Sequence, residues 1–271
     1  MKEQPIGLFD SSLGGLTVYQ EIKKLLPYES YIYFGDTGRS PYGSRPEAEL
    51  RSFVTQIMQF MQNQQAKAIV IACNTVTALG LEQLSQEFCV PVIGVSRIPE
   101  LTVAATRNKR VGVIGTEITV RSGLHKQDIL QLDPAIQVFY AACPKFTPIL
   151  NSGDLAGPAA RAAVAEYLSP LRAAQIDTLV LGCTAFPFLL PAIRSFMGED
   201  ITILDPAAET ARQLLHCLQQ TGGLHKADNP TSTLLFSEPD IEKIRCIAGK
   251  LIDVADCRFQ YLDLDQGQAP V

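Results

Sequence analysis

The chain has 271 residues, is 46% hydrophobic and carries a net charge of −5, so it can bury one large or two medium-sized cores. The acidic balance, with no basic run, excludes general nucleic-acid binding, because phosphate contacts need clustered Lys and Arg. No stretch approaches the ~20 apolar residues of a membrane-spanning helix, and the N-terminus lacks the apolar core of a signal peptide. With seven cysteines, an odd number, we expect a cytoplasmic protein that does not associate with membranes.

The first third of the chain alternates between strand-like and helix-like segments. Short apolar runs rich in β-branched residues predict buried strands, and longer runs with apolar residues at helical spacing predict helices. The predicted strands are residues 5–9, 31–34, 68–72 and 91–95, and the predicted helices are residues 16–26, 47–63 and 75–88.

A second series repeats this pattern. It predicts strands at residues 110–115, 136–140, 178–182 and 201–204, with helices near residues 119–131, 157–174, 186–196 and 207–220. The sequence IGLFD at 6–10 is echoed by VGVIG at 111–115. The two series predict an α/β protein of two pseudo-symmetric lobes, each with a parallel sheet.

The tail from residue 222 starts with a polar break and then predicts a strand at 233–236, a helix at 241–250 and a strand at 258–262. These elements are too few to fold alone, so we assign them to the first lobe. The expected domains are residues 1–96 with 207–271, and residues 97–206. We expect an active-site cleft between the lobes, where small-molecule sites often lie.

Two cysteines follow matching strands. AIVIACNT at 68–75 resembles TLVLGCTA at 178–185, and the two place Cys73 and Cys183 110 residues apart at strand ends. Open α/β sheets bind ligands at such ends, beside helix N-termini that attract carboxylates and lower a thiol's pKa. Paired thiols suggest acid/base chemistry on two faces of one substrate, whereas burial in the core is the alternative for a single cysteine.

The remaining cysteines lack this context, and we interpret them as structural. They are Cys89, Cys143, Cys217, Cys246 and Cys257. No Cys-x-x-Cys and no close Cys/His cluster occurs, so the sequence predicts no metal site.

Two polar loops fit the predicted cleft. In DSSLGGLT at 10–17 the glycines let backbone N–H groups approach an anion, and Asp10 would face the ligand unless it only caps the turn. The loop at 36–46 brings donors from Tyr42, Gly43 and Ser44. Neither a dinucleotide-binding nor a phosphate-loop glycine motif is present.

Five blocks, in order, resemble the cofactor-independent aspartate/glutamate racemases, and among these most closely the enzymes that act on glutamate. The blocks are IGLFDSSLGGL (6–16), YFGDTGRSPYG (33–43), VIACNT (70–75), VIGTEITVRSG (113–123) and LVLGCTAFPFL (179–189).

The resemblance implies two flavodoxin-like lobes and proton transfer by Cys73 and Cys183, with Asp10 as a further catalytic residue and with no cofactor. It implies racemisation of glutamate, with D-glutamate supplied for peptidoglycan, and we expect a homodimer. The residues that it places around the substrate are Asp10, Ser11, Tyr42, Gly43, Asn74, Thr75, Thr116, Thr119, Thr184 and Ala185.

The chain departs from the family pattern near the second cysteine. Ala185 occupies a position that is usually histidine, and Asn151 stands where an acidic residue is typical. Asp154 is a candidate substitute for the missing acid. The three histidines, His125, His216 and His225, lie outside the matching motifs, and we expect them at solvent-facing positions.

Two other functions stay open. The altered second half-site suits an aspartate racemase or a specialised paralogue. The second open function is that of a racemase-like protein that acts mainly by binding a partner such as DNA gyrase, although no added interaction segment is evident. A cysteine hydrolase is disfavoured because no partnering histidine is evident.

Overall fold

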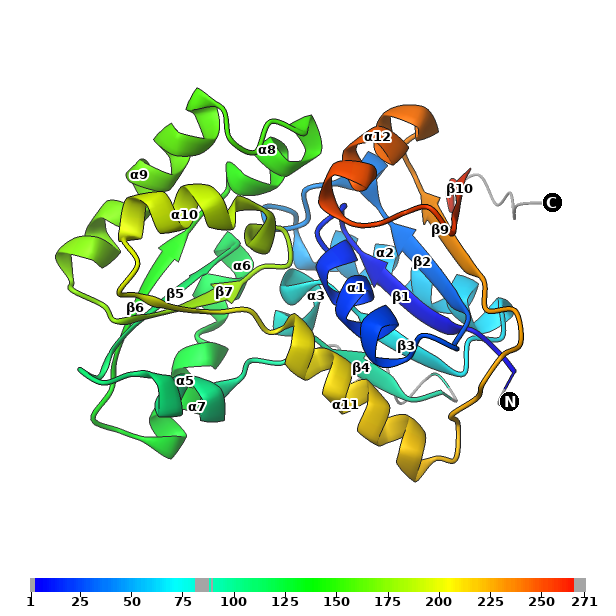
Figure 1. The fold of residues 1–271 in the computed structure, drawn as a ribbon, viewed down its shortest axis with the longest axis horizontal. Helices are drawn as coiled ribbons and strands as arrows, with labels where there is room; N and C mark the ends of the chain where they lie inside the picture. Colours follow the sequence, from blue (N-terminus) through cyan, green and yellow to red (C-terminus); the bar gives the residue numbers. More distant parts are fainter. Residues whose placement is uncertain (1–2, 81–87, 89, 266–271) are drawn as a thin grey trace.

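The computed structural model describes residues 3–80, 88 and 90–265, which form two α/β lobes, each built on its own parallel sheet (Figure 1). The first sheet has the strand order β10-β9-β2-β1-β3-β4. Its strands are β1 (Ile6–Asp10), β2 (Tyr31–Gly35), β3 (Ala68–Ile71), β4 (Val92–Gly94), β9 (Ser232–Phe236) and β10 (Cys257–Tyr261).

The second sheet has the order β6-β5-β7-β8, and its pairs are parallel as well. Its strands are β5 (Arg110–Gly115), β6 (Gln137–Ala142), β7 (Thr178–Gly182) and β8 (Thr202–Leu204). The order repeats β2-β1-β3-β4 of the first sheet, strand for strand. The predicted fold of two pseudo-symmetric parallel α/β lobes is therefore confirmed.

Helices cover both faces of the first sheet. Alternate residues of β1 point to opposite faces, as a strand requires, so Leu8 joins one buried cluster and Phe9 another. The helices α1 (Leu16–Leu25), α11 (Ala207–Gln220) and α12 (Ile241–Leu251) supply the first cluster, and α2 (Glu47–Asn63) supplies the second.

The second sheet is covered in the same way. One face packs against α5 (Pro99–Ala105) and α7 (Leu124–Leu132), and the other against α9 (Pro158–Ala173) and α10 (Leu190–Met197). The cluster on the second face continues without a break into the α1 face of the first lobe. The two lobes therefore share one hydrophobic core.

The C-terminal segment completes the first sheet. β9 pairs with β2 along its whole length, for example Tyr33 with Leu234, and β10 pairs with β9. Before it does so the chain leaves the second lobe through α11, which packs against α1 (Figure 1).

Most predicted elements occur within one or two residues of their expected bounds. The helix predicted near 119–131 is instead two helices, α6 (Glu117–Ser122) and α7, because Gly123 between them has φ of 68°. The helix predicted at 75–88 begins as α3 (Asn74–Ala78), while residues 81–87 lie outside the described part. The predicted helix at 186–196 starts as the 3₁₀ turn η2 (Phe186–Leu189).

Among the described residues, three short helices were not predicted: η1 (Thr37–Arg39), α5 and α8 (Phe146–Ser152). None exceeds seven residues, too short for a helical period to show in the sequence. Within the described ranges, no helix has the length and apolar character needed to cross a bilayer.

Candidate active site

A cavity with about 510 Å³ of empty volume lies between the two lobes at the carboxyl ends of their strands. Clefts between two lobes are common places for small-molecule sites. The cavity lining comes from the segments after β1, β2 and β3 of the first lobe and after β5, β6 and β7 of the second. The lining residues are Asp10, Ser11, Ser12, Pro41, Tyr42, Gly43, Ser44, Cys73, Thr75, Thr116, Glu117, Cys143, Pro144, Thr147, Cys183 and Thr184.

The two cysteines occupy equivalent places in the two lobes. Cys73 follows β3 and is the N-cap residue of α3, and Cys183 directly follows β7. Both line the cavity, and both are nearly buried, with 3% and 9% of their surface exposed. β3 and β7 hold the same position in their sheets, so the repeat detected in the sequence brings one thiol from each lobe to a single cavity.

Asp10 ends β1 and sits among hydrogen-bond donors. Its carboxylate accepts the backbone N–H groups of Ser11 (2.7 Å) and Gly15 (2.5 Å) and the hydroxyl of Thr184 from the second lobe (3.2 Å). It also accepts a hydrogen bond from Cys73. Burial nevertheless raises the pKa of Asp10 from 3.8 to about 6, so the carboxylate is mostly ionised at neutral pH.

The thiol of Cys73 is held between two acceptors, the Asp10 carboxylate and the Ser11 hydroxyl, whose oxygen lies 3.7 Å from the sulfur. Burial raises the pKa of Cys73 well above its ordinary value, and the charge of Asp10 raises it further. The backbone N–H of Val76, in the first turn of α3, opposes this effect. The thiol is therefore protonated while Asp10 stays ionised.

Cys183 has a different environment. Burial raises its pKa to about 12, and the charge of Asp10 contributes in the same direction. Hydrogen bonds with the backbone N–H of Ala185 and the side chain of Thr147 act the other way. Cys143, which we expected to be structural, also lines the cavity, and its pKa is raised by burial and by the nearby Cys183.

Three threonines connect the lobes on one side of the cavity. The hydroxyls of Thr75 and Thr116 lie 2.9 Å apart across the interface, and those of Thr116 and Thr119 lie 3.0 Å apart. Thr116 caps α6 by accepting the backbone N–H of Thr119. Thr119 is fully buried behind Thr116 and does not line the cavity.

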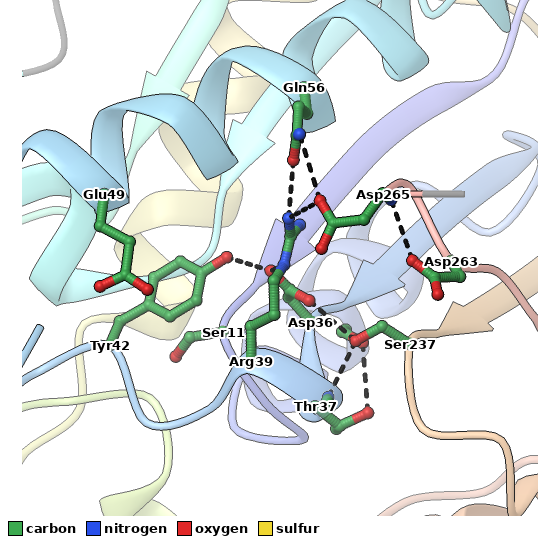
Figure 2. A network of polar contacts seen from close by, with 12 residues as sticks. Ser11, Asp36, Thr37, Arg39, Tyr42, Glu49, Gln56, Ser237, Asp263 and Asp265 are labelled. Atoms are coloured by element: carbon green, nitrogen blue, oxygen red, sulfur yellow. Dashed lines mark hydrogen bonds and ion pairs between the residues drawn. The ribbon is translucent and has the colours of Figure 1, made fainter. Parts of the chain in front are cut away.

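A polar network fixes the loop that follows β2 (Figure 2). Its centre is the buried carboxylate of Asp36, which accepts hydrogen bonds from Tyr42, from Arg39 Nε (2.7 Å) and from Ser237 Oγ (2.8 Å). Arg39 also reaches Asp265 near the C-terminal end, at 3.1 Å (Figure 2). The Tyr42 hydroxyl is engaged by Asp36, so Tyr42 contributes its ring and backbone to the cavity wall.

Three of the predicted substrate-contacting residues lie outside the cavity lining: Asn74, Thr119 and Ala185. Ala185 is 1% exposed and packs in the shared hydrophobic core, with its backbone close to Gly14. Asn151 is directed toward the first lobe, where its amide donates to Ser40 Oγ at 3.5 Å.

Asp154 is exposed and does not line the cavity. Its carboxylate lies against the backbone of Gly157, so its position gives no support to a role as the missing acid.

Our expectation for His125 is wrong. Its side chain is 3% exposed on α7, and both ring nitrogens are buried without a hydrogen-bond partner among the described residues. The ring packs close to the end of β7, where a Cβ at Gly182 would lie 3.6 Å from it, an ordinary packing distance. His216 is exposed and His225 is half-buried in the connection before β9.

The sequence did not single out Thr147 and Glu117, which also line the cavity. Each lies in the first turn of a short helix, α8 and α6, and only the packing of those helices brings them to the cavity.

No Lys, Arg or His side chain contributes to the cavity lining described above. Hydroxyls and backbone N–H groups are therefore the donors that this lining can offer to an anionic ligand. The described residues also contain no group of three or more His, Cys, Asp or Glu side chains arranged to hold a metal ion.

The fold and the site together define a two-lobed α/β protein in which equivalent strand ends of the two lobes each bring a cysteine, Cys73 and Cys183, to one cavity. Residues 6–214 match the Asp/Glu/hydantoin racemase family, and the chain belongs to that family.

The similarity to known relatives extends over the full length of the chain. The chain is 39% identical over 273 aligned residues to a glutamate racemase of Levilactobacillus brevis, covering 100% of this chain and 99% of the relative. The fold is similar to that of a glutamate racemase from Bacillus anthracis, with a TM-score of 0.89, 35% identity and coverage of 97% and 99%. The structure of a Francisella tularensis glutamate racemase in complex with D-glutamate gives a TM-score of 0.86 at 30% identity, with coverage of 98% and 100%.

Proposed function

We propose that this protein interconverts L-glutamate and D-glutamate, without a cofactor, by proton transfer through Cys73 and Cys183. The observation that carries the proposal is the pair of thiols that face one cavity from equivalent strand ends of the two lobes. Glutamate is favoured as the substrate because the relatives that match over the full chain are glutamate racemases.

Inversion at Cα needs a base on one face and an acid on the other. One cysteine removes the α-proton as a thiolate, and the opposing thiol returns a proton to the other face. The two roles exchange when the other enantiomer is bound. With a single group, the proton would return to the face it left, so both thiols are required for efficient inversion.

The resting site holds both cysteines as thiols, so one must lose its proton before catalysis. The Asp10 carboxylate accepts a hydrogen bond from Cys73 and has a pKa of about 6, which suits it to take the Cys73 proton near neutral pH. The ammonium group of a bound amino acid adds a positive charge beside the thiols, and this charge favours the thiolate.

The carbanion that forms at Cα spreads its charge onto the α-carboxylate. Preorganised donors stabilise such charge best where water is excluded. The hydroxyls of Thr75 and Thr184 and the backbone N–H groups after β1 and β2 are the donors we assign to the two carboxylates of the substrate. No Lys, Arg or His side chain lines the cavity to bind the substrate carboxylates in place of these donors.

Incubation with L-glutamate or D-glutamate in deuterium oxide tests the proposal. Proton NMR is expected to show loss of the α-proton signal, and circular dichroism is expected to show approach to a racemic mixture. Serine at either position is a far weaker acid, so Cys73→Ser and Cys183→Ser should each lose at least about a thousandfold in racemisation rate. Cys246→Ser, at an exposed site, is the matched control and should retain full activity.

Near-normal racemisation by either folded serine variant would overturn the two-thiol mechanism. Exchange with aspartate but not glutamate would overturn the substrate assignment. Activity that disappears on dialysis against a chelator, and returns only with a metal or pyridoxal phosphate, would overturn cofactor independence.

The proposal extends to the cell. D-glutamate is a building block of peptidoglycan, so we place the activity in the cytoplasm, in supply of cell-wall precursors. The homodimer expected from the family resemblance stays a prediction, which analytical ultracentrifugation measures.

A further inference from the structure

Thr147 lies beside Cys183 at the start of α8. Its side chain is 8% exposed, lines the cavity together with Cys183, and lies close enough to the thiol to lower its pKa. Thr147 belongs to none of the blocks that first pointed to the function. It reaches the site only because α8 packs over the turn that follows β7.

Aromatic packing fixes this contact. Phe146, the residue before Thr147, meets Phe186 edge-to-face with ring centroids 4.9 Å apart, and both rings are fully buried. Phe186 in turn donates its backbone N–H to the carbonyl of Cys183 at 3.1 Å. The first turn of α8 and the turn that holds Cys183 are therefore locked together, and the Thr147 hydroxyl is held against the thiol.

The two cysteines share two kinds of contact, although only Cys73 also has a hydrogen bond with the Asp10 carboxylate. Each sulfur meets one backbone N–H from the turn after it and one hydroxyl from a neighbouring segment of its own lobe. For Cys73 these are Val76 N–H and the Ser11 hydroxyl. For Cys183 they are Ala185 N–H and the Thr147 hydroxyl.

The other titratable groups around Cys183 do not supply a donor that favours its thiolate. Asp10 and Cys143 both carry negative charge when ionised and disfavour a second anion nearby. The remaining titratable groups of the lining are acids or phenols as well, namely Tyr42, Cys73 and Glu117. Thr147 is thus the side chain that offers Cys183 a hydrogen bond without adding negative charge.

We propose that Thr147 is a positioning residue for Cys183, donating a hydrogen bond that orients and stabilises the thiolate on the second face of the substrate. The role rests on the proposed racemase function. Thr147 keeps its own proton throughout: the α-proton passes from Cα to the Cys183 sulfur in one direction and back in the other. The Thr147 hydroxyl thus assists Cys183 where the side chains of Ala185 and Asn151, which replace the usual histidine and acidic residue, do not.

The direct test measures thiolate formation at each cysteine. Wild type, Thr147→Val and Thr147→Ser are alkylated with iodoacetamide across pH 6–11, and the rates at Cys183 and Cys73 are separated by peptide mass spectrometry. Thr147→Val has nearly the shape of threonine without its hydroxyl. It should lower the Cys183 alkylation rate at least about threefold at pH 8 and shift the rise of that rate with pH toward higher pH, because the thiolate loses a donor.

Cys73 is the internal reference and should alkylate as in wild type. Thr147→Ser retains the hydroxyl and should restore the Cys183 profile. Thr102→Val removes a buried hydroxyl of the same lobe that donates to the Ile98 carbonyl, outside the cavity lining, so it should leave both profiles unchanged. If Thr147→Val does not fold, Thr147→Ala removes the same hydroxyl with less steric demand.

Racemisation is then measured from both enantiomers. Thr147→Val should lower kcat at least about threefold from the enantiomer that Cys183 deprotonates, with the acidic limb of its pH profile shifted to higher pH, because Cys183 must be a thiolate in that direction. An unchanged Cys183 alkylation profile, or an equal shift at both cysteines, would overturn the inference. If the wild type alkylates as expected but does not racemise glutamate, the proposed function fails while the Thr147 contact stands.

Discussion

The hydroxyl of Tyr42 is hydrogen-bonded within the loop that follows β2, so we expect it to stabilise that loop rather than to bind the substrate. The variant Tyr42→Phe distinguishes these two roles. The hydroxyl donates to the buried Asp36 carboxylate, and burial with the charge of Asp36 raises the pKa of Tyr42, so it remains a donor at every working pH. A hydrogen bond to a charged group contributes about 1.5–3 kcal/mol to the free energy of unfolding. Arg39 and Ser237 still satisfy Asp36 in the variant, so we expect the lower half of this range.

The matched control is Tyr31→Phe. Tyr31 is equally buried, but its hydroxyl donates to the neutral carbonyl of Leu26 at 2.5 Å, away from the cavity. It should lose about 1 kcal/mol, with no change in KM. Urea denaturation and thermal melts measure both, and Tyr42→Phe should melt roughly 3–8 °C below wild type.

In activity assays Tyr42→Phe should raise KM severalfold, because the loop that carries Gly43 loses a tether, while kcat stays within about twofold of wild type. Two results would refute this reasoning. One is unchanged stability. The other is a hundredfold loss of kcat in a stably folded variant, which would mean that the hydroxyl acts on the substrate itself.

Three further predictions concern other parts of the molecule. Because the pKa of Asp10 is raised in the folded state, its contribution to stability is present below about pH 4 and is lost as pH rises through about 6. Between pH 4 and 7, the free energy of unfolding of wild type should therefore fall by up to about 3 kcal/mol more than that of Asp10→Asn. Parallel curves of unfolding free energy against pH would contradict this. In Gly14→Ala the new Cβ would lie 2.7 Å from a backbone nitrogen of the second lobe, so kcat/KM should fall at least about tenfold, whereas Gly249→Ala, with its nearest contact at 3.6 Å, should keep full activity. Lys67→Met leaves the Glu29 carboxylate buried without the ammonium that lies 2.5 Å away, so urea denaturation should show a loss of about 3–5 kcal/mol in the free energy of unfolding. The double variant Lys67→Met/Glu29→Leu should regain most of this loss. Simple addition of the two single-variant losses in the double variant would argue against the ion pair.

The sequence predicted the parts of the fold that depend on local patterns. The helix at Glu47–Asn63 and the strand at Arg110–Gly115 were predicted to the residue, because each has a strong period or a clear apolar run between polar neighbours. The repeat also predicted that Cys73 and Cys183 end equivalent strands. Equivalent strand ends meet at one cavity only because the lobes face each other, which the resemblance implied and local patterns do not encode.

The rest of the site depends on tertiary packing. His125 sits in a polar stretch that suggests an exposed helix, yet tertiary packing leaves its side chain only 3% exposed. Tyr42 was predicted as a ligand donor because its residue type allows it, but its partner Asp36 is set by a network that includes Ser237, 201 residues further along the chain than Asp36. Thr147 escaped notice because a helix as short as α8 leaves no period to detect.

The pairing of β9 with β2 bears on the order in which the protein matures on the ribosome. Synthesis runs from the N-terminus, so β2 emerges with its outer edge open and stays so until residues 232–236 arrive nearly 200 residues later. An open edge strand invites pairing with other chains. Asp36 likewise lacks its partner Ser237 during this time, so the loop beside the cavity gains its final support only when Ser237, 201 residues further along the chain, has left the exit tunnel. A nascent chain stalled before β9 would contain both cysteines and the whole second lobe. It would still lack the pairing of β9 with β2 and the Ser237 hydrogen bond that hold the loop beside the cavity in place.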